Sequence, residues 1–339
     1  SFYARRAMGP DLAAAHRGVA DLLGVGSDEV VLTRNATEAL RALIVGYRAV
    51  GPGDAVLCAD HDYDAMLNCM AALRERRGVE LIRIALPHPA SYQGLIDAYA
   101  AALEAHPRVR LVLLTHLGHR SGLVLPVAEI AALAKARGAD VIVDAAHSLG
   151  QLDTRVPELG ADFIGVNLHK WIGAPLGVGA MVVRRGRQDA IATDPAASPE
   201  RDSGIAALMH TGTVDFAAVL ALPTALAFQQ GIGAAARAAR LRALRNRWTA
   251  QLGGLGAIDI LTPDDSRLHG AITSFRLRNT PTLRDHEAFA ARLLEAHRVF
   301  TVVRTGLHDG PCIRVTPALA NTMDDCDRLV HAVRASLAS

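Results

Sequence analysis

Apolar positions in the first half of the chain alternate between helical spacing and short continuous runs. Helical spacing predicts helices over residues 12–23, 63–76, 95–105 and 127–137, with another that ends near residue 47. The runs between them predict strands over residues 29–32, 54–59, 80–85, 109–115 and 140–144. Two further apolar runs, the second at residues 180–183, precede and follow Lys170. This strand–helix alternation predicts a mostly parallel sheet covered by helices on both faces.

The second half of the chain has a different pattern. A helix over residues 234–252 is followed by strand-like runs over residues 258–261, 272–277, 300–303 and 312–315, with helices over 284–297 and 323–335. We therefore expect a large α/β domain over residues 11–230. A smaller α+β domain is expected over residues 231–339, with residues 1–10 joined to it.

Two segments of the second half test this interpretation. The uncharged run 216–236 is long enough for a membrane span, but Pro223 and several Gln and Gly residues interrupt it. A helix buried inside the protein or at a subunit contact is the better interpretation. The helix over 234–252 carries basic residues beside its apolar stripe, as is typical of a solvated helix margin rather than a nucleic-acid face. These residues are Arg240, Arg242, Arg245 and Arg247.

Composition narrows the function classes. Half of the 339 residues are hydrophobic and 21% are charged, as in ordinary globular proteins. The net charge of +2 gives no electrostatic case for nucleic acid or an anionic membrane. No CxxC pair or metal-ligand spacing occurs among Cys58, Cys69, Cys312 and Cys326, so we expect reduced thiols, no metal site and a cytoplasmic protein.

Candidate chemistry lies where strands end, because parallel α/β sheets bind ligands outside the carboxyl ends of their strands. That rule selects Asn35, Thr37, Asp62, Tyr63, His116, His119, Asp144, His147 and Lys170. Lys170 stands between His169 and Trp171 beside a Gly/Pro-rich loop. Burial there would lower the pKa of its ammonium group and favour Schiff-base chemistry. A solvated surface lysine is the alternative.

Two other strand ends fit the needs of an aldehyde cofactor. Asp144 ends an apolar strand, where a carboxylate would need either a helix to cap or a cationic partner such as a protonated pyridine nitrogen. The strand–turn–helix arrangement around Asn35 and Thr37 can present backbone N–H groups and a hydroxyl to a phosphate. A simple helix N-cap is the alternative there.

Taken together, five motifs resemble those of pyridoxal-phosphate enzymes of the aminotransferase class V family, fold type I. They are Asn-Ala-Thr-Glu at 35–38, Asp-Ala-Ala-His at 144–147, His-Lys-Trp at 169–171, Gly-Thr-Val-Asp at 212–215 and Ile-Arg-Val-Thr-Pro at 313–317. Within the family the chain looks most like the isopenicillin N epimerase-like branch. The resemblance implies a mostly parallel seven-stranded sheet in the large domain.

The resemblance also implies a role for each matching residue. Lys170 would form the Schiff base and move the α-proton, Asp144 would pair with the pyridine nitrogen, and His147 would lie near the phenolic oxygen. Arg314 would hold the substrate α-carboxylate, although from the residue alone a salt bridge is the alternative. Further cofactor contacts are implied for Ala36, Thr37, Tyr63, His119, Asn167, His169, Gly212 and Thr213. Of these, Tyr63 would stack on the ring, and Gly212 and Thr213 would reach the phosphate of the neighbouring subunit.

One departure from the family pattern bears on the reaction. The loop over 303–310 has His308 and Asp309 where cysteine desulfurases of the family carry a nucleophilic cysteine. Cys312 is close in sequence but belongs to the following strand, which argues against desulfuration through a persulfide.

The resulting expectation is a pyridoxal-phosphate enzyme that acts at Cα of an amino acid or aminoacyl substrate, as a homodimer with shared active sites. Epimerisation or transamination is the first expectation, and a C–S lyase similar to hercynylcysteine sulfoxide lyases is the alternative. A non-catalytic pyridoxal-phosphate-binding regulator is a different class that the sequence leaves open. A Rossmann nucleotide-binding protein is disfavoured, because no G-x-G-x-x-G opens the first helix.

Overall fold

The computed structural model describes residues 2–200, 202–280 and 282–338, and its largest element is a seven-stranded sheet of order β1-β7-β6-β5-β4-β2-β3. The strands are β1 (Val30–Thr33), β2 (Ala55–Ala59), β3 (Glu80–Ile84), β4 (Val109–Thr115), β5 (Asp140–Asp144), β6 (Phe163–Asn167) and β7 (Gly179–Val183). Strands β2 to β6 pair in parallel, whereas β7 runs antiparallel to both β1 and β6. The predicted mostly parallel seven-stranded sheet is therefore confirmed.

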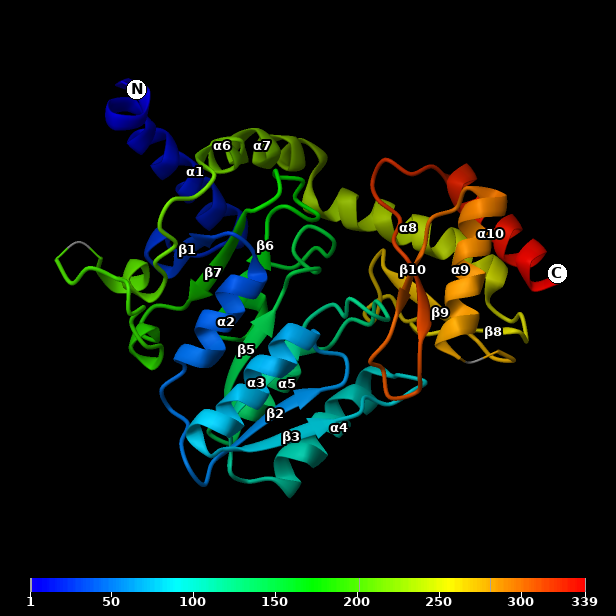
Figure 1. Cartoon of the computed structure of the whole chain (residues 1–339), viewed down its shortest axis with the longest axis horizontal. Helices are drawn as coiled ribbons and strands as arrows, with labels where there is room; N and C mark the ends of the chain where they lie inside the picture. Colours follow the sequence, from blue (N-terminus) through cyan, green and yellow to red (C-terminus); the bar gives the residue numbers. More distant parts are fainter. Residues whose placement is uncertain (1, 201, 281, 339) are drawn as a thin grey trace.

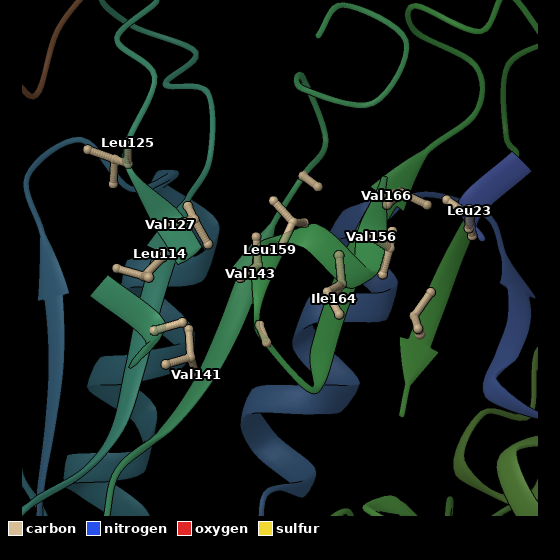
Figure 2. Packing of buried hydrophobic residues seen from close by; sticks show 14 of the residues in the cluster. Leu23, Leu114, Leu125, Val127, Val141, Val143, Val156, Leu159, Ile164 and Val166 are labelled. Carbon is tan, nitrogen blue, oxygen red and sulfur yellow. The ribbon is translucent and has the colours of Figure 1, made fainter. Parts of the chain in front are cut away.

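Helices cover both faces of this sheet (Figure 1). They are α1 (Met8–Leu23), α2 (Ala36–Gly46), α3 (Asp64–Arg77), α4 (Tyr92–Ala105), α5 (Val127–Ala136), α6 (Phe216–Leu220) and α7 (Leu222–Ile232). Alternate side chains of β4 divide between the faces: Leu111 and Leu113 pack with α2 and α3, while Leu114 packs with α1, α4 and α5. Figure 2 shows part of the buried cluster that contains Leu114. In that view Leu114 and Val143, from neighbouring strands, lie below Val127 and Leu159. Burial on both faces explains why these strands are continuous apolar runs.

A second sheet of four antiparallel strands, in the order β10-β11-β9-β8, forms the core of the smaller domain. Its elements are α8 (Ala234–Leu252), β8 (Ile258–Ile260), β9 (Thr273–Leu277), α9 (Leu283–His297), β10 (Val302–Arg304), β11 (Cys312–Val315) and α10 (Met323–Ala338). Helix α8 runs from the large domain into the smaller one (Figure 1). There Trp248 meets Phe275 edge-on, with ring centroids 6.5 Å apart, and Phe275 meets Phe289 in the same way at 6.1 Å.

Two expectations are corrected by the packing. Residues 2–10 do not join the small domain: the π-helix Tyr3–Ala7 continues into α1, which packs on α6 and α7, and Figure 1 shows this end away from α9 and α10. Ser1 lies outside the described residues. Arg245 is not on a solvated margin, because it is 1% exposed and donates hydrogen bonds to Thr262 and Thr273.

The uncharged run 216–236 forms α6, α7 and the start of α8 rather than one continuous helix. Within the described residues, no single helix has the length and apolar composition to cross a membrane. Only the pair of segments Phe216–Ile232 and Ala234–Leu252, bent by 75° at their junction, meets those criteria together.

The two domains meet closely at Gly122, which follows β4 in the chain. Its φ of +85° lies in the left-handed region, and a Cβ atom built there would lie 2.0 Å from the carbonyl oxygen of Ile272, just before β9. Only glycine fits this contact without moving one backbone against the other.

Substitution Gly122→Ala should therefore destabilise the protein through both strain and overlap. Gly138→Ala is the matched control, because Gly138 has a φ of +74° but no heavy atom near the position of its Cβ. The control should cost about 1 kcal/mol of unfolding free energy. Gly122→Ala should cost roughly 2 kcal/mol more, since overpacking adds to the conformational term. Urea unfolding curves measure both values, and equal losses would show that the interface relaxes around the methyl group.

Candidate active site

A cavity of about 560 Å³ lies at the carboxyl ends of the central strands, closed on one side by β10 and β11 of the small domain. Most of the predicted site residues line it: Ala36, Thr37, Tyr63, His119, Asp144, His147, Asn167, His169, Lys170 and Arg314. This size is within the range of small-molecule sites. The cavity is therefore the candidate active site.

Strand register explains why these residues meet. Thr115 at the end of β4 pairs with Asp144 at the end of β5, and Asn167 at the end of β6 pairs with Gly179 at the start of β7. Because β7 is antiparallel, its first residue lies at the same edge and also pairs with Thr33 at the end of β1. Polar strand ends from distant parts of the chain are thereby set side by side.

Lys170 contacts His147, and the ring of His147 is oriented by Trp171, the residue that follows Lys170. Its Nζ lies 3.0 Å from Nε2 of His147, and Trp171 Nε1 donates to Nδ1 of the same ring at 3.4 Å. An indole N–H can only donate, so Nδ1 must accept and the proton of a neutral ring lies on Nε2. The His147–Lys170 contact is then a hydrogen bond only if the lysine is an unprotonated amine.

The surroundings of Lys170 favour that amine. Burial lowers the pKa of its ammonium group, although its stem faces the open cavity, and the charges of Arg314 and Arg304 lower it further. The Asp144 carboxylate opposes them. Burial also lowers the pKa of His147 well below the usual range, and Lys170 adds to this effect, so the ring is neutral.

Asp144 is a buried carboxylate without a salt bridge among the described residues. It accepts a hydrogen bond at 2.9 Å from the amide of Ala146, two residues later, as a local turn does. Burial raises its pKa, and the Ala146 amide and Lys170 charge oppose the rise. The helix-cap alternative finds no support, because Ala145 and Ala146 are followed by turns rather than by a helix.

Two other strand-end candidates do not face the cavity. Asp62 is buried and accepts hydrogen bonds from the amide and hydroxyl of Thr115, at 3.0 and 2.7 Å, which ties the loop after β2 to the end of β4. Burial raises its pKa to about 7. His116 is likewise buried, and burial lowers its pKa to about 4. Both are structural parts of the sheet edge.

The predicted strand–turn–helix arrangement around Asn35 and Thr37 forms at the start of α2. Asn35 caps the helix by accepting from the Glu38 amide at 2.8 Å, and the Ala36 amide donates to Oδ1 of Asn167, also at 2.8 Å. Ala36 thus lines the cavity with its amide already engaged, which leaves Thr37 to present a hydroxyl at the positive end of the helix dipole. The cap and the anion site are therefore compatible at this turn.

Tyr63 and His119 form an aromatic wall. Their rings meet edge to face, with centroids 5.2 Å apart and an interplanar angle of 88°. Tyr63 is 39% exposed toward the cavity, whereas Nδ1 of His119 is buried without a hydrogen-bond partner in the described chain. Burial lowers the pKa of His119 to about 3, and neighbouring cations contribute.

Two arginines of the small domain face the aromatic wall, and one of them was missed from the sequence. Arg314 donates to the His119 carbonyl at 2.9 Å, and burial lowers its pKa to about 10, with the Arg304 charge adding. Arg304 lines the same cavity from β10, where Val302 pairs with Arg314, so both arginines lie on one face of the small sheet. Neither has an acidic partner among the described residues, and the Nε of each is buried and unpaired.

Gly212 and Thr213 are exposed on the loop before α6 and do not line this chain's cavity. Their predicted contact with a neighbouring subunit stays a prediction.

The residues of the cavity fit pyridoxal phosphate. A buried carboxylate that lacks a cationic side chain suits a protonated ring nitrogen, and a lysine with a lowered pKa suits attachment to an aldehyde. A helix N-terminus suits the phosphate group, and arginines that have no acidic partner in the described part of the chain suit a substrate carboxylate.

Comparison with known proteins gives an independent result. A family-wide profile described as "Aminotransferase class-V" matches residues 6–339. An isopenicillin N epimerase from Streptomyces clavuligerus is 31% identical over 95% of this chain and 83% of its own length. A putative L-cysteine desulfhydrase from Oryza sativa subsp. japonica is 34% identical, but over 66% of this chain and 49% of its own length.

The fold of solved relatives agrees. The cystine C–S lyase C-DES, solved with its product cysteine persulfide, superposes with a TM-score of 0.83 at 21% identity, covering 98% of this chain and 88% of that one. Another structure of C-DES holds glycine covalently linked to its pyridoxal-phosphate cofactor.

The titration of Lys170 is directly measurable, because the sequence contains only two lysines, Lys135 and Lys170. In cofactor-free protein labelled by reductive 13C-methylation, the Lys170 resonance should titrate below the ordinary lysine pKa of 10.5. The Asp144 carboxylate favours the ammonium form and Arg314 disfavours it. Asp144→Asn should therefore lower this pKa further, and Arg314→Gln should raise it. Lys135→Arg assigns the resonance, and shifts of the opposite sign would contradict the electrostatics described above.

Proposed function

The chain belongs to the aminotransferase class-V family and is a pyridoxal-phosphate-dependent enzyme, and we propose that it acts at Cα of an amino-acid or aminoacyl substrate as an epimerase or aminotransferase. The observation that carries this proposal is the contact of Lys170 with His147 in a cavity that also presents two arginines, Arg304 and Arg314, without an acidic partner among the described residues. An isopenicillin N epimerase from Amycolatopsis lactamdurans, 27% identical over 97% of this chain, adds support.

Lys170 is the proton carrier in this proposal. Bound pyridoxal phosphate supplies an electron sink that acidifies the Cα–H bond of an amino acid held through its nitrogen. The Lys170 amine can accept that proton, because burial lowers the pKa of its ammonium group. Its single lone pair, which accepts from His147 Nε2–H in the bare cavity, must leave that hydrogen bond first. Trp171 keeps the His147 ring in the required tautomer.

The remaining residues bind and orient. Asp144 would hold a proton on the ring nitrogen, which requires it to stay charged despite burial, and a cationic partner at that position lowers its pKa. Thr37 and the N-terminus of α2 would bind the phosphate. Arg314 would clamp the substrate carboxylate, and its bond to the His119 carbonyl fixes the direction of its guanidinium group.

A C–S lyase is the second candidate, favoured by the likeness of part of the chain to a putative L-cysteine desulfhydrase. Such a reaction needs no cysteine of the enzyme, and the same Lys170 could remove the α-proton before a β-substituent leaves. Desulfuration through an enzyme persulfide is disfavoured. Within the described chain no cysteine lines the cavity. Cys312, the cysteine nearest in sequence to the loop over 303–310, is buried, and burial raises the pKa of its thiol to about 11.

The active unit proposed is a homodimer. Gly212 and Thr213 lie beside α6, and the uncharged helices α6 and α7 expose Phe216 and Phe228, the latter by 65%. Exposed aromatic residues on an uncharged surface are typical of a subunit contact. The contact of Gly212 and Thr213 with a partner's phosphate site is what the resemblance to the family implies for such a dimer.

A panel of L- and D-amino acids in D2O tests the reaction type. At least one member should exchange its α-proton for deuterium, and the products then distinguish the outcomes: inverted configuration for an epimerase, a keto acid for an aminotransferase, and pyruvate with a released sulfur compound for a lyase. Lys170→Ala should lose the visible absorbance of lysine-linked cofactor and slow exchange by roughly 10²- to 10⁴-fold. With cofactor bound, failure of every free amino acid to exchange would refute the proposal for free amino acids. Failure of short aminoacyl peptides added to the panel as well would refute it altogether and favour a regulatory binding protein.

Arg314→Ala tests the carboxylate clamp separately. A charge-assisted hydrogen bond contributes about 1.5–3 kcal/mol, so the dissociation constant of the reactive amino acid should rise roughly 10- to 100-fold. Cofactor absorbance should be retained. Loss of the cofactor with unchanged amino-acid affinity would place Arg314 in the cofactor site instead.

A further inference from the structure

The segment from His119 to Gly122 joins the two domains. Its backbone carbonyls accept hydrogen bonds from the small domain: His119 from Arg314 at 2.9 Å, and Ser121 from the Ser274 amide at 3.0 Å. The carbonyl of Arg120 accepts from the Ser274 hydroxyl at 2.5 Å. Together with the close approach of Gly122 to Ile272, these contacts place β9 and β11 directly on this segment.

The side chain of Arg120 extends this junction to two other segments. It is 1% exposed, and its Nη1 donates to the carbonyls of Asp60 and Asp62, at 3.0 and 2.5 Å. Its Nε donates to the carbonyl of Thr305 at 2.6 Å, and its Nη2 pairs with the Asp64 carboxylate. One planar group with donors in a fixed fork thus holds the loop after β2 and the loop after β10.

Both of these loops carry cavity residues. The first contains Tyr63, the outer residue of the aromatic wall, and the second begins at Arg304. The Asp60 carboxylate adds a second tie, because it accepts from the His308 amide at 3.0 Å. Gly306 lies against the guanidinium group, where a Cβ atom would meet Arg120 at 2.9 Å.

We propose that Arg120 is a positioning residue for substrate binding: it locks the Tyr63 turn of the large domain to the Arg304 loop of the small domain, so that the aromatic and cationic walls form one unit. Arg120 does not line the cavity and contacts neither the lysine nor the carboxylate of the site. Its removal leaves three carbonyls without their donor, so the two loops lose their common anchor. The inference rests on the proposed function in one respect, that the substrate is an amino acid.

The test compares Arg120→Met with wild-type holoenzyme, using the amino acid of the panel that wild-type protein exchanges fastest. KM should rise roughly 10- to 100-fold, as expected for misplaced charge-assisted contacts. The change in kcat and in cofactor absorbance should stay within about threefold, because Lys170 and Asp144 lie on other elements. Amide hydrogen exchange of residues 304–310 should become faster, because the Thr305 carbonyl and its loop are released.

Two further variants separate positioning from general stability. Arg120→Lys keeps the charge and some donors but not the fork, so its KM should fall between wild type and Arg120→Met. Arg245→Met removes another arginine that is 1% exposed and donates to loop carbonyls, but all of these lie within the small domain. In this variant KM and the amide hydrogen exchange of residues 304–310 should stay at wild-type values.

An unchanged KM in Arg120→Met, or an equal rise in Arg245→Met, would overturn the inference. If wild-type protein exchanges the α-proton of no member of the panel, the proposed function fails. Amide hydrogen exchange then decides alone whether Arg120 holds the two loops together. Faster exchange at residues 304–310 in Arg120→Met but not in Arg245→Met would support it, and equal exchange in both would overturn it.

Discussion

The buried carboxylate of Asp144 is the constraint on which the chemistry of the cavity depends. It ends a central strand, and a charge there is stable only beside a cation. In the bare cavity the side-chain charge that favours the Asp144 carboxylate is that of Lys170, and Asp144 in turn raises the pKa of Lys170 against the effect of burial. A protonated ring nitrogen would replace Lys170 as the partner. Asp144 would then stay charged when the cofactor binds, and it would no longer raise the pKa of Lys170. The same carboxylate would therefore have a cationic partner with and without the cofactor.

The cavity belongs to both domains, and this follows from where the polar strand ends lie. The large sheet supplies Lys170, Asp144 and the phosphate turn, but within the described residues it places no arginine without an acidic partner in the cavity. Arg304 and Arg314 come from β10 and β11, so the proposed carboxylate recognition would require the small sheet to be held at a fixed distance from the large one. The close contact of Gly122 with Ile272 and the hydrogen bonds of Ser274 set that distance. In the proposed function, domain packing is therefore part of substrate recognition.

The sequence predicted the large sheet well because strands buried on both faces are continuous apolar runs, and the strand-end rule then selected Asp144 and Lys170. Arg304 and Arg120 were missed for a physical reason. Among 36 basic residues, nothing local distinguishes an arginine whose partners lie across a domain interface. Arg120 bonds to Thr305, 185 positions away, and such contacts leave no periodicity. Residues 2–10 were misassigned likewise, because the sequence did not show that α1 packs on α7.

Arg304 and Arg314 would link the proposed substrate binding to the basicity of Lys170. Both guanidinium charges lower the pKa of its ammonium group. A carboxylate bound to Arg314 cancels part of that field, so the lysine amine holds a proton more strongly when substrate is present than when it is absent. His119 and His147 feel the same two charges, and their pKa values should rise together with that of Lys170. The two arginines would therefore do more than bind the proposed carboxylate. They lower the pKa of the ammonium group in the empty cavity, and a carboxylate bound between them would raise it again when a substrate proton is there to be taken.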